Sequence, residues 1–269
     1  MEQLKEKYDK LIAMLKNMKR VAVAFSAGVD STFLLQACYD ALGENVVAIT
    51  GHFISFTDRE NKESQAFCNA LGIKQIVVDV DQMSIAGFSD NPPNRCYLCK
   101  KALFSRFLTV ATENNCCYIV EGSNADDVKD YRPGLKAIEE LGIKSPLKEV
   151  GLTKNEIRTL SEQMVLPTWN KPSFACLATR FPYGERITTE KIAMVDKAEQ
   201  LLLDYGFQQE RVRIHGDIAR IEIDRSQFSK IIDPKITEAI VQKFHELGFL
   251  YVTLELNGYV TGSMNKLLK

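Results

Sequence analysis

The sequence of 269 residues lacks any long apolar run. Its longest apolar stretches, such as residues 21–25, span about five residues, whereas a helix needs about 20 to cross a bilayer. The segment from Met1 to Lys7 also has no apolar core of the kind that a secretory signal requires. We therefore expect a cytoplasmic protein without a membrane partner.

The sequence also lacks a large net charge of either sign. The 34 Lys and Arg residues nearly balance the 35 Asp and Glu residues, which leaves a net charge of −1. No overall basic field therefore favours binding to nucleic acid. The sequence also shows no internal repeat and no low-complexity segment, and its 45% hydrophobic and 26% charged residues are typical of a globular protein.

Seven cysteines are present, an odd number that predicts reduced thiols rather than a disulfide framework. Cys96 and Cys99 have the spacing of half a zinc site, but no second pair follows to complete four ligands. A buried structural role is the favoured interpretation of this pair, and a metal site or a redox pair are the alternatives.

The first half of the sequence alternates short apolar runs with amphipathic stretches, which predicts strands and helices in turn. Such a series predicts a doubly wound, mostly parallel α/β sheet, in which ligands bind beyond the carboxyl ends of the strands. The strands are expected at 21–25, 46–50, 76–80 and 118–121, and the helices at 31–42, 58–71, 98–113 and 153–163.

The pattern changes after residues 165–172, where two prolines interrupt regular structure. We place a domain boundary near residue 168, which gives domains of residues 1–168 and 169–269. Helices at 189–204 and 235–247 and strands at 211–215, 219–223 and 251–256 predict a smaller α+β domain in the second half.

A segment rich in small residues, Ser26-Ala-Gly-Val-Asp-Ser31, follows the first strand and opens a helix. Small residues let backbone N–H groups approach an anion, and a helix N-terminus adds partial positive charge. Ser26, Gly28 and Ser31 are therefore candidate phosphate contacts. Asp30 could hold Mg²⁺ or cap the helix, and an ordinary strand–helix turn is the alternative interpretation.

This segment resembles the Ser-Gly-Gly-x-Asp-Ser loop of the ATP pyrophosphatases, the PP-loop family with an adenine nucleotide alpha hydrolase-like fold. The resemblance implies that ATP is split to AMP and pyrophosphate while a substrate is adenylated, with Mg²⁺ as cofactor. Ala27 stands where the family usually has glycine, and its methyl group is tolerated if φ is negative.

The stretch Glu121 to Asp127 resembles a second nucleotide-binding segment of that family. It contributes four candidate nucleotide, substrate or magnesium contacts, although Asn and Asp also form plain turns. These candidates are Gly122, Asn124, Asp126 and Asp127.

Cys176 lies in a loop with prolines and glycine, near Lys171, Arg180 and Arg186. Nearby cations favour the thiolate form of a cysteine, although a lone cysteine is more often a small buried residue. An adenylated carboxylate would be a natural electrophile for that thiolate.

With this loop included, the chain resembles the ATP-dependent sulfur transferases that build the nickel-pincer nucleotide cofactor of lactate racemase. The resemblance implies adenylation of pyridinium-3,5-biscarboxylic acid mononucleotide, attack by Cys176, and conversion of Cys176 to dehydroalanine as its sulfur becomes a thiocarboxylate. We also expect a homo-oligomer and a downstream nickel-inserting protein. The segments that carry the resemblance are residues 24–31, 94–100, 124–127, 131–134, 171–180 and 211–215.

Arg211, Arg213 and His215 alternate along one predicted strand and so share one face. Together with Arg180, the two arginines are candidate ligands of the substrate's phosphate, and a solvated strand face is the alternative.

Three other functions use parts of the same pattern. An amide-forming synthetase or a tRNA thiolase would keep the ATP chemistry and change the nucleophile, but no glutaminase domain and no basic surface support them. A non-enzymatic adenine-nucleotide sensor would leave the Cys176 loop unexplained.

Overall fold

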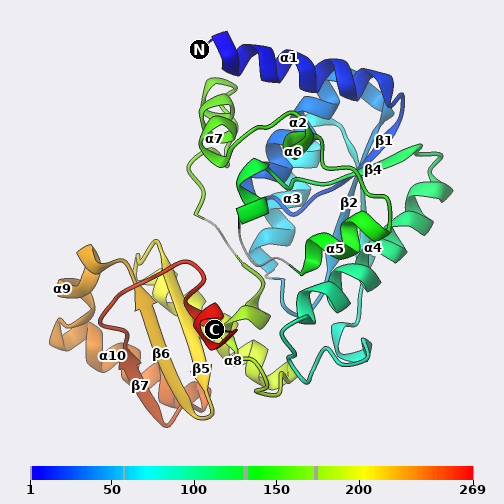
Figure 1. The fold of residues 1–269 in the computed structure, drawn as a ribbon. Coiled ribbons are helices and arrows are strands. Elements are labelled where there is room, and N and C mark those ends of the chain that lie inside the picture. The colour runs from blue at the N-terminus through cyan, green and yellow to red at the C-terminus, as the bar shows by residue number, and fades with distance from the viewer. Residues whose placement is uncertain (1, 57, 130–132, 173–174, 269) are drawn as a thin grey trace. The chain divides into compact units, whose positions relative to one another are not determined.

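The computed structural model describes residues 2–56, 58–129, 133–172 and 175–268 (Figure 1). The chain forms two compact units, Met1–Gln82 with Cys96–Phe174, and Met83–Arg95 with Ala175–Lys269. Across the described ranges, no helix combines the length and the apolar character that a membrane span needs.

The second unit includes a short segment from the middle of the sequence, which sequence patterns do not place there. Asn91 Nδ2 donates to the carbonyl of Pro182 at 2.6 Å, and Arg95 Nη1 donates to the carbonyl of Ala178 at 2.9 Å. Both side chains are buried. These polar contacts join residues more than eighty positions apart, so hydrophobic periodicity carries no signal of them.

The first unit contains a parallel sheet of four strands in the order β3-β2-β1-β4, as the doubly wound prediction requires. The chain first winds outward from β1 to β3 and then places β4 on the other side of β1. The carboxyl ends of β1 and β4 therefore form the point at which the winding reverses. The strands are β1 (Val21–Ala24), β2 (Val46–His52), β3 (Lys74–Asp79) and β4 (Tyr118–Val120).

Helices cover both faces of this sheet. Successive residues of β1 point to opposite faces, so Val23 packs into one apolar cluster and Ala22 into the other. One cluster takes side chains from α1 (Glu2–Asn17), α2 (Val29–Leu42), α3 (Asp58–Leu71), α6 (Pro146–Glu149) and α7 (Lys154–Gln163); the other takes them from α4 (Arg95–Glu113) and α5 (Gly134–Glu140). Figure 1 shows α4 and α5 together beside the sheet.

Two features of the helices show how the sequence sets their bounds. Thr153 and Glu156 form the reciprocal capping box at the start of α7, with Glu156 Oε2 accepting from Thr153 N at 2.8 Å. The prediction did not include α1, although Leu11 and Leu15 are spaced four apart and are fully buried.

The second unit has the predicted order of helix, two strands, helix and strand, with one further short helix, α9, before the second long helix. Its sheet has the order β5-β6-β7, with β5 and β6 antiparallel and β6 and β7 parallel. The elements are α8 (Thr189–Asp204), β5 (Glu210–His215), β6 (Ile218–Ile223), α9 (Phe228–Ile231), α10 (Pro234–Leu247) and β7 (Tyr251–Leu254).

Candidate functional site

A pocket in the first unit opens where the winding of the sheet reverses. Its floor is the loop between β1 and α2, and Glu121, Gly122 and Ser123 follow from the end of β4. The cations Lys100 and Lys154 and the carboxylates of Asp30, Glu121 and Asp127 also line it. The candidate phosphate loop, Ser26 to Ser31, and charged side chains thus meet at the edge of the sheet where ligands bind in this class of fold.

Ser31 closes the loop on itself. Its Oγ accepts from the backbone N–H groups of Ser26 at 3.3 Å and Gly28 at 3.2 Å, and it lies 3.1 Å from Ser26 Oγ. Gly28 is the N-cap of α2, so the first N–H groups of that helix are left for a ligand. The predicted residues Ser26, Gly28 and Ser31 therefore lie together in one compact loop, and their contact with a phosphate stays a prediction.

Ala27 adopts a left-handed conformation with φ of 52°, so the condition under which its methyl group is tolerated, a negative φ, is not met. Its side chain is 2% exposed, so the methyl group is packed into the core as well. An L-residue with a Cβ is strained in this region, which explains why the family pattern has glycine here.

Ala27→Gly should relieve this strain. We expect the free energy of unfolding to rise by about 1 kcal/mol, because glycine adopts positive φ without penalty. Urea unfolding of both proteins measures the difference. Unfolding at lower urea in the variant would show that the buried methyl contributes more than the backbone strain costs.

Asp30 lies at the centre of the charged side of the pocket. Its Oδ2 accepts from Lys154 Nζ at 2.6 Å, and its Oδ1 accepts from Asn124 Nδ2 at 3.4 Å. Burial raises the pKa of Asp30, while the charge of Lys154 opposes that shift. Asp127, whose negative charge also acts on Asp30, accepts from Asn124 N at 3.0 Å.

Lys154 is a pocket residue that the motif analysis missed. It occupies the first turn of α7, where the helix dipole disfavours a cation, and its backbone N–H donates to Asp126 Oδ2 at 2.9 Å. A lysine at an unfavourable helix position is the signal that could have identified it. Asp126 thus holds the start of α7. Asp127 lines the pocket, whereas Asp126 is not among the lining residues.

The residues around Asp30 fit a magnesium ion. Mg²⁺ takes oxygen ligands and is usually held by one or two carboxylates together with substrate phosphates and water. Asp30 and Asp127 provide such a pair at the mouth of the phosphate loop. Within the described residues there is no group of three or more metal-ligating side chains, so a cation here would depend on the phosphates for its remaining ligands.

Gly122 is required by close packing against the start of α2. A Cβ at this position would lie 3.1 Å from Ser31 N and 3.2 Å from the carbonyl carbon of Asp30. Both atoms are backbone, so they can yield only if the phosphate loop shifts.

Gly122→Ala should therefore weaken ATP binding while the protein stays folded. A displacement of the N–H groups that costs one charge-assisted hydrogen bond lowers affinity about ten- to a hundredfold. Calorimetric titration with a non-hydrolysable ATP analogue measures the affinity, and thermal unfolding establishes that the variant is folded. An unchanged affinity in Gly122→Ala would show that the packing of Gly122 against the loop does not affect ATP binding.

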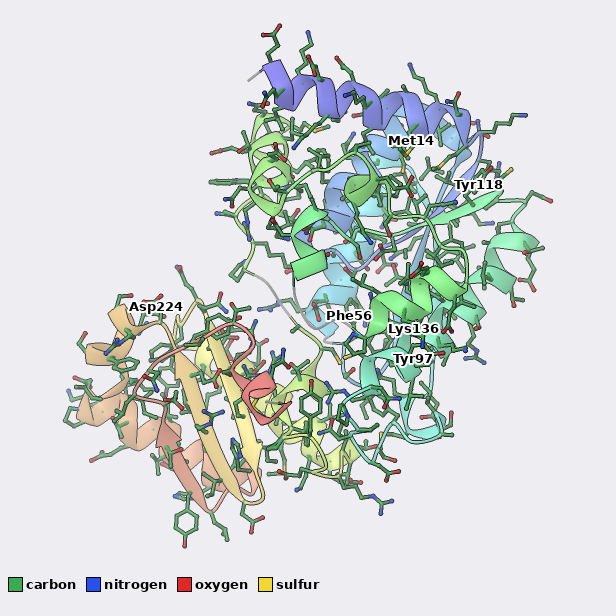
Figure 2. The ribbon with its side chains drawn as sticks, in the orientation of Figure 1. Met14, Phe56, Tyr97, Tyr118, Lys136 and Asp224 are labelled. Atoms are coloured by element: carbon green, nitrogen blue, oxygen red, sulfur yellow. The ribbon has the colours of Figure 1, made fainter. Side chains whose placement is uncertain are left out.

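The other side of the pocket is apolar. Phe53 and Phe56 lie with ring centroids 5.5 Å apart, and Leu103, Phe104 and Phe107 come from α4. Phe56 is labelled in Figure 2, where its side chain lies in the first unit beside α5 and the end of the sheet. This wall can accept a flat apolar group next to the phosphate loop.

Cys176 belongs to the second unit, where it precedes a short 3₁₀ turn at Leu177–Arg180 and is exposed. Arg180 is 1% exposed and forms a bidentate ion pair with Glu199 of α8, with N–O distances of 2.7 and 2.8 Å. The exposed position separates Cys176 from Cys38 and Cys68, whose thiols are buried in the first unit.

Arg211 and Arg213 are buried as well, so a solvated strand face is wrong for this strand. Arg213 donates to Glu222 Oε2 from Nε at 3.1 Å and from Nη2 at 2.9 Å. Arg211 lies over the ring of Tyr259, with 5.2 Å from its guanidinium carbon to the ring centroid. Their binding to a substrate phosphate stays a prediction.

Glu210 is a buried carboxyl group beside these arginines, and neither of its oxygens has a hydrogen-bond partner among the described residues. Burial and the negative charge of Glu199 raise the pKa of Glu210 to about 8. The folded protein therefore holds a proton on Glu210 that the unfolded chain loses at lower pH.

The free energy of unfolding should consequently fall as pH rises from about 4.5 to about 8. The expected loss from this group is of the order of 5 kcal/mol, at 1.36 kcal/mol per pKa unit. Glu210→Gln should flatten this part of the curve, because glutamine has no proton to lose. Equal slopes in urea unfolding of both proteins between pH 5 and 8 would contradict the buried neutral acid.

Cys99 has a role in packing. Its Sγ accepts from Gln82 Nε2 at 3.2 Å, and Gln82 Oε1 in turn accepts from Ser55 Oγ at 2.7 Å. Gln82 is buried, so this chain of contacts joins α4 to the segment after β2. In the part of the chain that the structure describes, no cluster of metal ligands includes Cys96 or Cys99.

The parallel sheet flanked by helices, with a loop of small residues at its switch point, is the fold of the PP-loop ATP pyrophosphatases. The chain is 37% identical over 269 residues to the pyridinium-3,5-bisthiocarboxylic acid mononucleotide synthase of Lactiplantibacillus plantarum, covering all of this chain and 97% of that protein. It is 40% identical over 265 residues to an uncharacterized protein of Synechocystis, covering 98% and 99% of the two chains.

A more distant relative supports the same class. A glutamine-hydrolysing GMP synthase component from Archaeoglobus fulgidus is 23% identical over 248 residues, covering 82% of this chain and 77% of that protein. No family model matches the chain. The chain belongs to the family of the Lactiplantibacillus synthase, the ATP-dependent sulfurtransferases of the PP-loop superfamily.

Proposed function

We propose that the protein adenylates a carboxylate of pyridinium-3,5-biscarboxylic acid mononucleotide and converts it to a thiocarboxylate with the sulfur of Cys176. The observation that carries the proposal is the pairing, in one chain, of a PP-loop pocket with an exposed cysteine in a turn braced by a buried arginine. Identity to the Lactiplantibacillus synthase over the whole chain supports the choice of substrate.

The first step activates the carboxylate. The N–H groups at the start of α2 would bind the β- and γ-phosphates, and Lys100 and Lys154 would neutralise phosphate charge. Magnesium bound by Asp30 and Asp127 would supply further positive charge at the phosphates. A carboxylate oxygen of the substrate attacks the α-phosphorus, and pyrophosphate leaves with the electron pair of the broken P–O bond.

The second step transfers sulfur. The Cys176 thiolate attacks the acyl carbon of the mixed anhydride, and AMP leaves to give a thioester. A base then removes the Cα proton of Cys176, the Cβ–S bond breaks, and the electron pair stays on sulfur. The products are the thiocarboxylate and dehydroalanine at position 176, so each chain supplies one sulfur atom.

Other parts of the prediction complete the proposal. The thiocarboxylate product carries a soft sulfur ligand, which suits consumption by a nickel-inserting protein in the biosynthesis of the nickel-pincer cofactor of lactate racemase. A cytoplasmic homo-oligomer is the expected form. Amide formation is less suitable, because the GMP synthase subunit of Archaeoglobus fulgidus is 23% identical to this chain and the Lactiplantibacillus synthase 37%. The net charge of −1 does not favour a tRNA substrate.

Mixing the protein with ATP, Mg²⁺ and the biscarboxylated nucleotide tests the proposal. We expect pyrophosphate and thiocarboxylate to form together, the second up to the amount of enzyme when no sulfur donor is added. Pyrophosphate release without thiocarboxylate, with amide formed when ammonia is supplied, would instead assign an amide-forming synthetase.

A further inference from the structure

One buried guanidinium holds the backbone around Cys176. Arg180 Nη1 donates to the carbonyl of Ala175 at 2.8 Å and to Thr179 Oγ1 at 2.8 Å, and it lies 3.4 Å from the carbonyl oxygen of Cys176. Arginine has five N–H groups, and four of them are used here when the two bonds to Glu199 are included. This side chain therefore has little capacity left for a substrate phosphate.

The Cys176 carbonyl is held from several sides. It accepts from Thr179 N at 2.9 Å and from Thr179 Oγ1 at 2.8 Å, in addition to the longer contact with Arg180. Rotation of the Cys176 peptide would break all of these bonds, so the direction in which the Cys176 side chain points from the backbone is restricted.

Arg180 and Thr179, which together hold the Cys176 carbonyl and are called the clamp below, are anchored to the core of the second unit. Glu199 Oε1, which binds Arg180, also accepts from Val212 N of β5 at 2.8 Å. Arg213 of the same strand donates from Nη1 to the carbonyl of Thr179 at 3.0 Å. The turn thus rests on α8 and β5, both built from regular structure, rather than on other loop residues.

The same guanidinium acts on the sulfur through its charge. Burial lowers the pKa of Arg180, but the Glu199 carboxylate outweighs that effect, and negative charge on Cys176 raises the pKa further. The interaction is reciprocal, so the Arg180 cation favours a thiolate at Cys176.

We propose that Arg180, braced by Glu199 and Thr179, is the positioning residue for Cys176: it fixes the Cys176 backbone and places a permanent cation beside the thiolate. This inference rests on the proposed function for its purpose, since a fixed thiolate is what attack on an acyl-adenylate needs. It assigns Arg180 to the nucleophile instead of to the substrate's phosphate.

Alkylation of the thiol tests the charge without any turnover. Iodoacetamide reacts with the thiolate, so the rate of carbamidomethylation at Cys176 against pH, followed by peptide mass spectrometry, reports thiolate formation. The double variant Arg180→Gln/Glu199→Gln removes both charges and leaves neither buried and unpaired. We expect its alkylation curve to move to higher pH, while Arg186→Gln, which removes an exposed cation of the same loop, leaves the curve in place.

A curve for the double variant that coincides with wild type would overturn the electrostatic part of the inference. Circular dichroism and thermal unfolding establish that the variant is folded. The alkylation needs neither ATP nor substrate, so it decides the role of Arg180 even if the protein forms no thiocarboxylate and the proposed function fails.

Thr179 variants test the geometry. Thr179→Val keeps the shape but removes the hydroxyl that bridges Arg180 and the Cys176 carbonyl, whereas Thr179→Ser retains it. We expect the single-turnover rate of thiocarboxylate formation to fall about ten- to a hundredfold in the valine variant and to recover in the serine variant. Pyrophosphate release should be unchanged in both, and equal sulfur-transfer rates in valine and serine variants would overturn the clamp.

Discussion

Cys176→Ala is expected to abolish thiocarboxylate formation and to leave adenylation intact. The alanine variant has no sulfur to give, while the phosphate loop, Asp30 and Lys154 all belong to the first unit. Its circular dichroism and thermal unfolding should match wild type, because the side chain at position 176 is exposed. The measurement is parallel quantification of pyrophosphate and thiocarboxylate in a single turnover.

Cys117→Ala is the matched control for this experiment. Cys117 is also exposed but lies in the first unit next to β4. It should yield as much thiocarboxylate as wild type. If Cys176→Ala still forms thiocarboxylate, or if Cys117→Ala forms none, a cysteine other than Cys176 supplies the sulfur.

Asp30→Asn is expected to lower pyrophosphate release by at least about a hundredfold. The carboxylate holds Lys154 at 2.6 Å and provides the charged oxygens that suit magnesium at the phosphate loop. A metal at transferring phosphates is worth several kcal/mol in the transition state, and each 1.36 kcal/mol is a tenfold change in rate. The readout is substrate-dependent pyrophosphate release at saturating ATP and several Mg²⁺ concentrations.

Asp40→Asn serves as its control, because Asp40 is an exposed carboxylate at the other end of the same helix. The asparagine at position 30 is close in size to aspartate, so folding should be retained. Pyrophosphate release at the wild-type rate in Asp30→Asn would remove this carboxylate from the magnesium site.

The sequence predicted the first unit well because its signals are local. Apolar runs of strand length and the amphipathic stretches between them mark elements whose order alone implies a doubly wound sheet. The loop from Ser26 to Ser31 was identifiable because phosphate binding requires small residues at a fixed place after a strand. The left-handed Ala27 was not, since its φ depends on packing around the loop rather than on the residue type.

The second unit shows where sequence patterns are insufficient. Alternation along β5 placed Arg211 and Arg213 on one face, but it could not show that Glu222 pairs with Arg213 inside the unit. Arg180 was predicted to bind phosphate, which stays a prediction, and periodicity could not show that its guanidinium pairs with Glu199 and donates to the carbonyl of Ala175. Burial and pairing of charges depend on contacts between distant segments, which periodicity does not record.

The fate of Cys176 is the most direct test of the account. Intact-protein mass spectrometry after a single turnover with ATP, Mg²⁺ and the biscarboxylated nucleotide should show loss of the elements of hydrogen sulfide. Peptide mapping should then place dehydroalanine at position 176. An unmodified Cys176 after product has formed, or many turnovers without an added sulfur donor, would contradict the sacrificial transfer.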